Sequence, residues 1–296
     1  MLFACSASGS SSAAEAAEQH RLVQDQVDWA AFLARHDLVW DRLGKNYFEA
    51  PFVGNGLVGA MIWQDSDNTL RLSVGRTDVT DHRTGSEPEA IVLKGRLPIG
   101  HFLLTTVGKI RGGTMRLVLH DAEARGTVET ARGRISWRLL THAERPVNIV
   151  ELIAEDDEAD CSWSFQPEES VVPRKKSPER VNPPATRETR DEVEICVQSR
   201  PAGGDYATAW QEIRTGKLRR LFISIADRYP TAGAADDAVA AVRKAAAMPF
   251  DELLAAHRRW WHAYYPASFI SIPHARMESY YWIQIYKLGS CIRKGG

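Results

Sequence analysis

Apolar and polar residues alternate with a period of two along most of the chain between Leu38 and Ala226. This alternation is typical of β-strands that bury one face, and the Gly, Asp and Asn residues between the runs indicate turns. The predicted strands cover residues 57–63, 69–74, 101–107, 114–120, 134–142, 147–154, 193–198 and 218–226. Because no long helical pattern separates them, we predict a mainly β fold with a large antiparallel β-sandwich.

Two segments inside this region do not alternate clearly. The stretch 168–192 is rich in proline and charge and almost free of large apolar residues, so we predict a mobile loop or insertion. We read a second loop at 203–212, which carries Tyr206 and Trp210 beside polar residues. Rings in such a loop either contact carbohydrate or tuck into the core, and the sequence leaves both alternatives open.

The pattern becomes helical after Pro230. An alanine-rich helix is predicted at 236–247, and "PFDELLAAHRRWWHAYYPAS" carries the apolar stripe of an amphipathic helix. The last predicted helix, in "HARMESYYWIQIYKLGSC", has large apolar side chains on nearly every side, so we expect it to be buried all round. Few helical residues precede it. We therefore expect a missing helical barrel or a partner chain to cover it.

These patterns divide the chain into four parts: a tail with a short helix (1–35), the β domain (36–230), linker helices (231–268) and the final helix (269–296). The apolar run that ends at Cys5 loosely resembles the lipobox of a bacterial lipoprotein. A basic segment and an apolar stretch of roughly 7–15 residues, which a signal peptide needs, are missing. Either the true start lies upstream or this is a disordered Ser/Ala tail, and we favour the tail.

Composition and charge exclude several classes. Hydrophobic content of 44% and charged content of 25% are typical of a soluble globular protein. The net charge of −1 provides no general attraction for nucleic acid, and no stretch approaches the ~20 apolar residues of a membrane span. The nine histidines and four cysteines show no metal-ligand spacing, so we predict neither a metal site nor a cofactor. A disulfide between Cys161 and Cys196 stays open.

The segment Gly54-Asn55-Gly56-Leu57-Val58-Gly59 matches the bare pattern of a dinucleotide-binding loop. A strand-like run follows it, whereas pyrophosphate binding requires the N-terminus of a helix. We therefore interpret the segment as a tight Asn-Gly turn with glycines where φ is positive. A nucleotide-dependent enzyme is a hypothesis that rests on these glycines only.

Charged residues cluster in "SVGRTDVTDHR", which ends a predicted strand and places Arg76, Asp78, Asp81 and His82 close together. Acids paired near His and Arg can transfer protons or bind sugar hydroxyls. A charged loop with internal salt bridges is the simpler interpretation, and from these residues alone we favour it. The motifs of serine hydrolases, zinc proteases and P-loop enzymes do not occur in the sequence.

Both ends of the chain resemble one architecture. "LVWDRLGKNYFEAPFVGNGLVGAMIW" followed by "LRLSVGRTDVTD" resembles the start of the N-terminal β-supersandwich domain of (α/α)6-barrel glycoside hydrolases, with the α-L-fucosidase-like family 95 and its relatives as the nearest suggestion. "HRRWWHAYYPASFISIP…ESYYWIQIYKL" resembles the linker helix and the first barrel helix of the same architecture. In one departure, Leu57 stands where the family often has Arg.

The resemblance implies a supersandwich followed by linker helices and the start of a truncated barrel. It implies the non-catalytic N-terminal domain of a glycoside hydrolase, inactive as this chain alone, because the family's catalytic carboxylates lie deep in the barrel and no residue here matches one. It further implies a glycan or oligosaccharide ligand and a secreted, periplasmic or lipoprotein location. The residues expected to face the barrel mouth and bind sugar are Asn55, Arg76, Asp78, Asp81 and His82. The alternative is a self-sufficient carbohydrate-binding or scaffold module.

Overall fold

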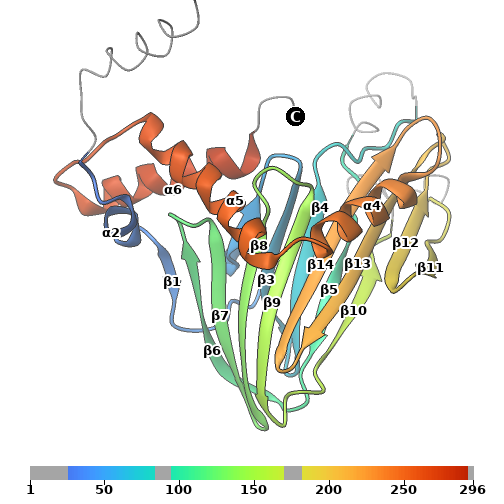
Figure 1. Ribbon diagram of the computed structural model, residues 1–296, viewed down its shortest axis with the longest axis horizontal. Helices are drawn as coiled ribbons and strands as arrows, with labels where there is room; N and C mark the ends of the chain where they lie inside the picture. Colours follow the sequence, from blue (N-terminus) through green and yellow to red (C-terminus); the bar gives the residue numbers. More distant parts are fainter. Residues whose placement is uncertain (1–25, 84–94, 170–181, 293–296) are drawn as a thin grey trace, which may run out of the picture.

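The computed structural model describes residues 26–83, 95–169 and 182–292. Within these residues, two antiparallel sheets stack face to face, with helices at one end and across one outer face (Figure 1). The nine-stranded sheet consists, in spatial order, of β1 (Leu38–Trp40), β6 (Ile110–Val118), β7 (Glu123–Thr130), β8 (Gly133–Thr141), β9 (Val147–Asp156), β14 (Leu218–Arg228), β13 (Asp205–Thr215), β12 (Val193–Ser199) and β11 (Thr186–Arg190). The five-stranded sheet consists of β10 (Ser162–Pro167), β5 (Gly100–Thr105), β4 (Thr69–Arg76), β3 (Val58–Ser66) and β2 (Phe52–Gly54). The prediction of a mainly β sandwich followed by helices is confirmed.

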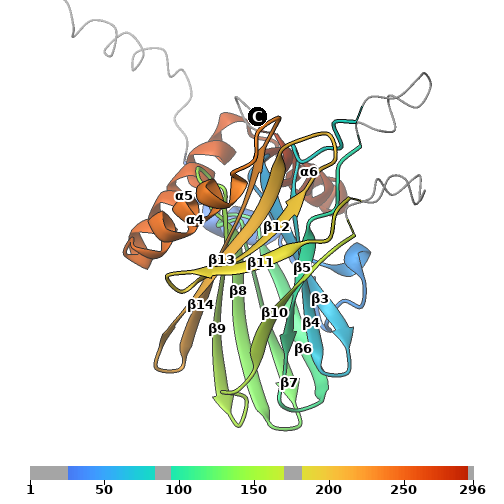
Figure 2. The same ribbon diagram turned by 90° about the vertical axis from the view of Figure 1, so that its right-hand side faces the viewer.

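The helical elements are α2 (Trp29–Ala34), η1 (Tyr47–Glu49), α4 (Ala234–Ala246), α5 (Phe250–Tyr264), η3 (Tyr265–Ala267) and α6 (Ala275–Cys291). Helix α4 covers the outer face of β12, β13 and β14, where its alanine and valine side chains pack on the sheet. Helices α5 and α6 lie together at one end of the sandwich, as both views show (Figure 2). None of the described helices has the length and apolar character needed to cross a membrane.

Alternating side chains of the two sheets form the main core. In β4, Leu70, Leu72 and Val74 are buried, whereas the residues between them are partly exposed. They share one hydrophobic cluster with Leu117 of β6 and Leu139 of β8. A second cluster lies between α4 and the nine-stranded sheet, which explains the nearly continuous burial along β14. Alternation of apolar and polar residues along the sequence therefore corresponds to strands that bury one face in the core.

The segment 203–212 is not a loop, contrary to the sequence-based expectation. Most of it belongs to β13, which pairs with β12 and β14. Tyr206 and Trp210 are buried in the main core, so the core alternative is confirmed for both rings. Cys161 and Cys196 are buried and free, so the disulfide that the sequence left open does not form.

The stretch 168–192 also differs from the expectation of one long loop. Thr186–Arg190 forms the edge strand β11, which pairs antiparallel with β12. Its residues are mostly exposed, so an edge strand without a buried face leaves no apolar signal in the sequence. Residues 170–181 lie outside the described part of the chain.

The glycine-rich segment forms the hairpin between β2 and β3, as predicted. Gly56 has a φ of +85°, which favours glycine. A second reason for glycine comes from α6: Gly56 N donates to Ser290 O at 2.7 Å, and a Cβ on Gly54 would lie 2.7 Å from the same oxygen. Since a strand follows the hairpin, the dinucleotide-loop interpretation is wrong.

Candidate functional site

Arg76 and Asp78 lie at the end of β4 and form a bidentate ion pair. The Arg76 guanidinium donates to both carboxylate oxygens of Asp78, at 2.6 and 2.9 Å. It also donates to Ile225 O on β14 at 2.6 Å, so it joins the two sheets. Asp78 is exposed and Arg76 partly buried. The internal salt bridge that we favoured from the sequence is present here.

Asp81 and His82 follow on the same segment but have different surroundings. Asp81 is buried and accepts hydrogen bonds from the Arg83 guanidinium and from Arg83 N. His82 is partly exposed, and its ring stacks on Tyr229 with centroids 3.7 Å apart. Burial, and after it the charge of Arg200, lowers the pKa of His82 below its usual range. The His82 ring is thus held against the Tyr229 ring, and its neutral form is favoured.

Arg200 connects these loops and was not identified from the sequence. Its guanidinium donates to Asp227 Oδ1 and Arg228 O at 2.6 Å each, and to Thr80 O at 3.3 Å. Arg200 lies 120 positions from Thr80, so no local motif joins them. The glycine pair 203–204 has positive φ angles, and a Cβ on Gly204 would lie 3.1 Å from Arg200 Nη2.

Asn55 has a structural place in the hairpin. Its Nδ2 donates to His142 O and Arg145 O at 2.9 Å each, and its Oδ1 accepts from Leu57 N and Val58 N. The side chain is buried, and these contacts use both donors of the amide. Asn55 therefore connects the hairpin to the loop after β8.

A groove of about 470 Å³ lies on the outer face of β2, β3 and β4, beside the end of α6. Gly54, Gly59 and Gly75 are register neighbours across these strands, so this part of the floor is bare backbone. Arg76 is the one predicted site residue among the described residues that line this groove. The other four predicted residues do not line this groove.

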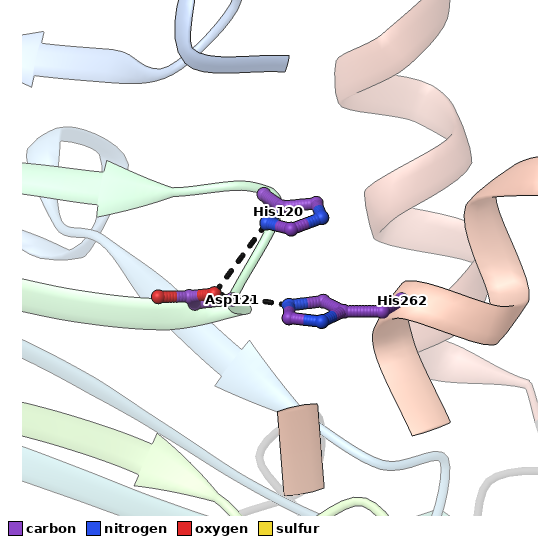
Figure 3. Close-up of side chains that lie close together, drawn as sticks. All are labelled: His120, Asp121 and His262. Carbon is purple, nitrogen blue, oxygen red and sulfur yellow. Dashed lines mark hydrogen bonds and ion pairs between the residues drawn. The ribbon is translucent and has the colours of Figure 1, made fainter. Parts of the chain in front are cut away.

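A different cluster joins the turn after β6 to helix α5 (Figure 3). Asp121 Oδ1 lies 3.1 Å from His262 Nε2 and 3.5 Å from His120 Nδ1. The two imidazole rings stack with centroids 3.8 Å apart. Since 141 positions separate Asp121 from His262, spacing along the sequence could not reveal this cluster.

Arginines surround the carboxylate of Asp121. Its Oδ2 lies 3.2 Å from Arg125 Nη2 and 3.3 Å from Arg258 Nη2. Both arginines also pair with Glu123, which is fully buried. The arrangement fixes the carboxylate with Oδ1 toward the histidines and Oδ2 toward the guanidiniums. The cluster of His120, Asp121 and His262 can attach α5 to the sandwich through hydrogen bonds, or it can bind a metal ion.

Helix α6 has one buried face and one exposed face. Trp282, Tyr286 and Gly289 are buried against α5 and the end of the sandwich. On the opposite side, Met277, Tyr280 and Leu288 are 53%, 60% and 50% exposed. The expectation that this helix is buried all round is therefore wrong for the described residues, because the large apolar side chains on one of its sides are at least half exposed.

No family model matches the sequence, and no curated protein matches it. Among solved structures, a putative kojibiose phosphorylase from the human microbiome is similar, with a TM-score of 0.59 and 10% identity. The similarity covers 86% of this chain and 39% of the phosphorylase, so the chain spans about two fifths of that protein. A GH92 α-mannosidase from Bacteroides thetaiotaomicron gives a TM-score of 0.39, which carries no argument.

At 10% identity, the similarity to the phosphorylase shows the fold alone. The sandwich-and-helix architecture that the sequence resemblance implies is therefore confirmed. A specific relation to the family 95 enzymes is not shown.

Proposed function

We propose that this chain is the N-terminal, non-catalytic β-sandwich region of a carbohydrate-processing protein. The observation that carries the proposal is the fold shared with the putative kojibiose phosphorylase over 86% of this chain. The sequence resemblance at both ends supports the same architecture. In this proposal the catalytic groups belong to helices that pack beyond α6, in the same polypeptide or in a partner.

The outer face of α6, formed by Met277, Tyr280 and Leu288, supports this arrangement. Each side chain is at least half exposed, and they follow one another along one side of the helix. Apolar side chains grouped in this way mark surfaces that other proteins or domains cover. Further helices of a barrel would bury them as Trp282 is buried on the inner side.

The predicted site residues take different roles in this proposal. Asp78 and His82 retain exposed surface and are the groups available to bind sugar hydroxyls. Arg76 lines the groove beside α6 and orients Asp78. Asn55 and Asp81 are buried and use their polar atoms internally, so they position the loops.

Two measurements test the proposal. Reading the coding sequence beyond Gly296 should reveal a helical-barrel sequence in the same frame or in an adjacent gene. The purified chain, incubated with kojibiose and other α-linked oligosaccharides with and without inorganic phosphate, should release no sugar. Turnover by the chain alone would contradict a non-catalytic role, and absence of any barrel sequence would contradict the proposed architecture.

A self-sufficient carbohydrate-binding module is the second candidate. A groove of about 720 Å³ on the nine-stranded sheet favours it, because the hydroxyl-bearing residues Thr114, Thr127 and Ser136 are among those that line it. Saturable glycan binding by the purified chain that is lost in Thr127→Val, with no barrel encoded nearby, would establish this alternative.

A further inference from the structure

We propose that His120, Asp121 and His262 bind one divalent transition-metal ion such as Zn²⁺. The cluster lies where helix α5 meets the turn after β6, outside the loops proposed to contact sugar (Figure 3). The inference does not depend on the proposed carbohydrate function.

The geometry brings three metal-binding atoms together. One nitrogen of each imidazole points to the same carboxylate oxygen, with Asp121 Oδ1 3.1 Å from His262 Nε2 and 3.5 Å from His120 Nδ1. The three ligand atoms all lie within 4.8 Å of one another. Tetrahedral zinc with ligands at about 2.0–2.2 Å separates its donor atoms by roughly 3.3–3.6 Å. The two imidazole rings now stack with their planes 11° apart, so coordination of one ion requires the rings to tilt until both nitrogens face a common point.

Neighbouring groups hold the ligands in place. Arg125 and Arg258 contact Asp121 Oδ2, which leaves Oδ1 as a single-oxygen ligand. His257 fixes the helix against the turn: Ala143 N donates to its Nδ1 at 3.2 Å, so its Nε2 carries the proton and donates to Asp121 O at 2.9 Å. Outer contacts of this kind commonly orient metal ligands.

The ligand types and the charge of the surroundings select the kind of ion. Two imidazoles and one carboxylate suit zinc and the later transition metals, whereas Ca²⁺ and Mg²⁺ prefer oxygen ligands. The two arginines repel a cation, and Glu123, which pairs with both, offsets part of this repulsion. We therefore expect weaker binding than at a structural zinc site with four protein ligands.

Binding would cross-link two distant segments. His120 and Asp121 belong to the turn between β6 and β7, and His262 belongs to α5. An ion bound to the folded state would stabilise the attachment of α5 to the sandwich by mass action. Three protein ligands leave one position for water in a tetrahedral site. All three residues are partly exposed, so an ion can reach the site from solvent.

Calorimetric titration of the chelator-treated full chain with ZnCl₂ tests the proposal, together with thermal melting in the presence and absence of Zn²⁺. We expect one ion per chain and a rise in Tm of a few degrees. MgCl₂ and CaCl₂ should give neither effect. His262→Ala and His120→Ala, on separate elements, should each lower the affinity for Zn²⁺ at least tenfold.

Two control variants should bind as the unmodified chain does. His274→Asn removes an exposed histidine and keeps a side chain that can cap α6, and Cys291→Ser removes an exposed thiol. The Tm without metal shows whether each histidine variant folds. One folded variant of the two is sufficient to test the proposal. Absence of saturable Zn²⁺ binding, or binding unchanged in a folded His120 or His262 variant, would overturn the proposal.

Discussion

The junction between the helices and the sandwich differs sharply from the outer face of α6. At the junction, Trp282 is fully buried, and Tyr286 Oη donates to Phe52 O at 2.6 Å. On the outer face, Tyr280 and Leu288 are at least half exposed. One helix thus carries two apolar surfaces, and only one of them has a described neighbour. The proposed barrel or partner would cover this outer face.

The largest effect expected at the junction follows from Trp282→Ala. Removing this fully buried ring should lower the free energy of unfolding by about 3–5 kcal/mol, because the surroundings cannot refill the space. Urea unfolding followed by circular dichroism measures it. A loss below about 1 kcal/mol would show that α6 is not part of the cooperative fold.

Acid should weaken the junction next. His142 lies in the loop after β8, and burial, with nearby His257, lowers its pKa to about 4. The unfolded chain protonates this histidine near pH 6.5, so the unfolded state binds more protons between about pH 6.5 and 4. The free energy of unfolding should therefore fall by about 2–3 kcal/mol as the pH decreases through this window. His142→Gln should flatten that part of the stability profile, and an unchanged profile would contradict the assignment.

The glycines of the groove provide a matched pair. Gly54→Ala should destabilise the chain by about 1–3 kcal/mol, because its Cβ would lie 2.7 Å from Ser290 O of α6. Gly75→Ala should change stability by less than about 1 kcal/mol, since its Cβ would meet no atom within 4 Å. Equal effects of the two substitutions would show that contact with α6 does not explain the glycine at position 54.

Loss of one hydrogen bond should have a smaller effect. Tyr286→Phe removes the donor to Phe52 O and keeps the ring, so we expect a loss of about 0.5–1.5 kcal/mol. Denaturant unfolding of the variant beside the unmodified chain measures it. An increase in stability would mean that this bond does not hold α6 to β2.

The smallest effect is expected on the outer face. Tyr280→Ala should change the free energy of unfolding by less than about 0.5 kcal/mol, because its side chain is 60% exposed. Compared directly with Trp282→Ala, it measures the asymmetry of the helix. A loss as large as that of Trp282→Ala would remove the distinction between the two faces.

Much of the sandwich could be predicted because burial of one face leaves a period of two. All eight predicted strand ranges overlap observed strands, and the three C-terminal helices fall where their patterns placed them. β7 was not predicted because its sequence, EARGTVET, contains few apolar residues. β11 was missed for the related reason that an edge strand needs no buried face.

The candidate sites were less predictable, because residues from distant segments form them. The prediction of a charged loop with internal salt bridges is confirmed, since Arg76 pairs with Asp78 and Arg83 pairs with Asp81. Neither Arg200 under the His82 loop nor His262 beside Asp121 could be inferred, since each contact joins segments more than a hundred positions apart. The sugar-binding role assigned to Asp78 and His82 stays a prediction.

Hydroxyl-radical footprinting of Met277 and Tyr280 tests the central claim most directly. Their oxidation rates would be compared between the purified chain and the protein as its native cells make it. If the outer face of α6 contacts further helices, both side chains should be strongly protected in the native protein and reactive in the purified chain. Equal reactivity in the two samples would contradict the claim that this face is covered.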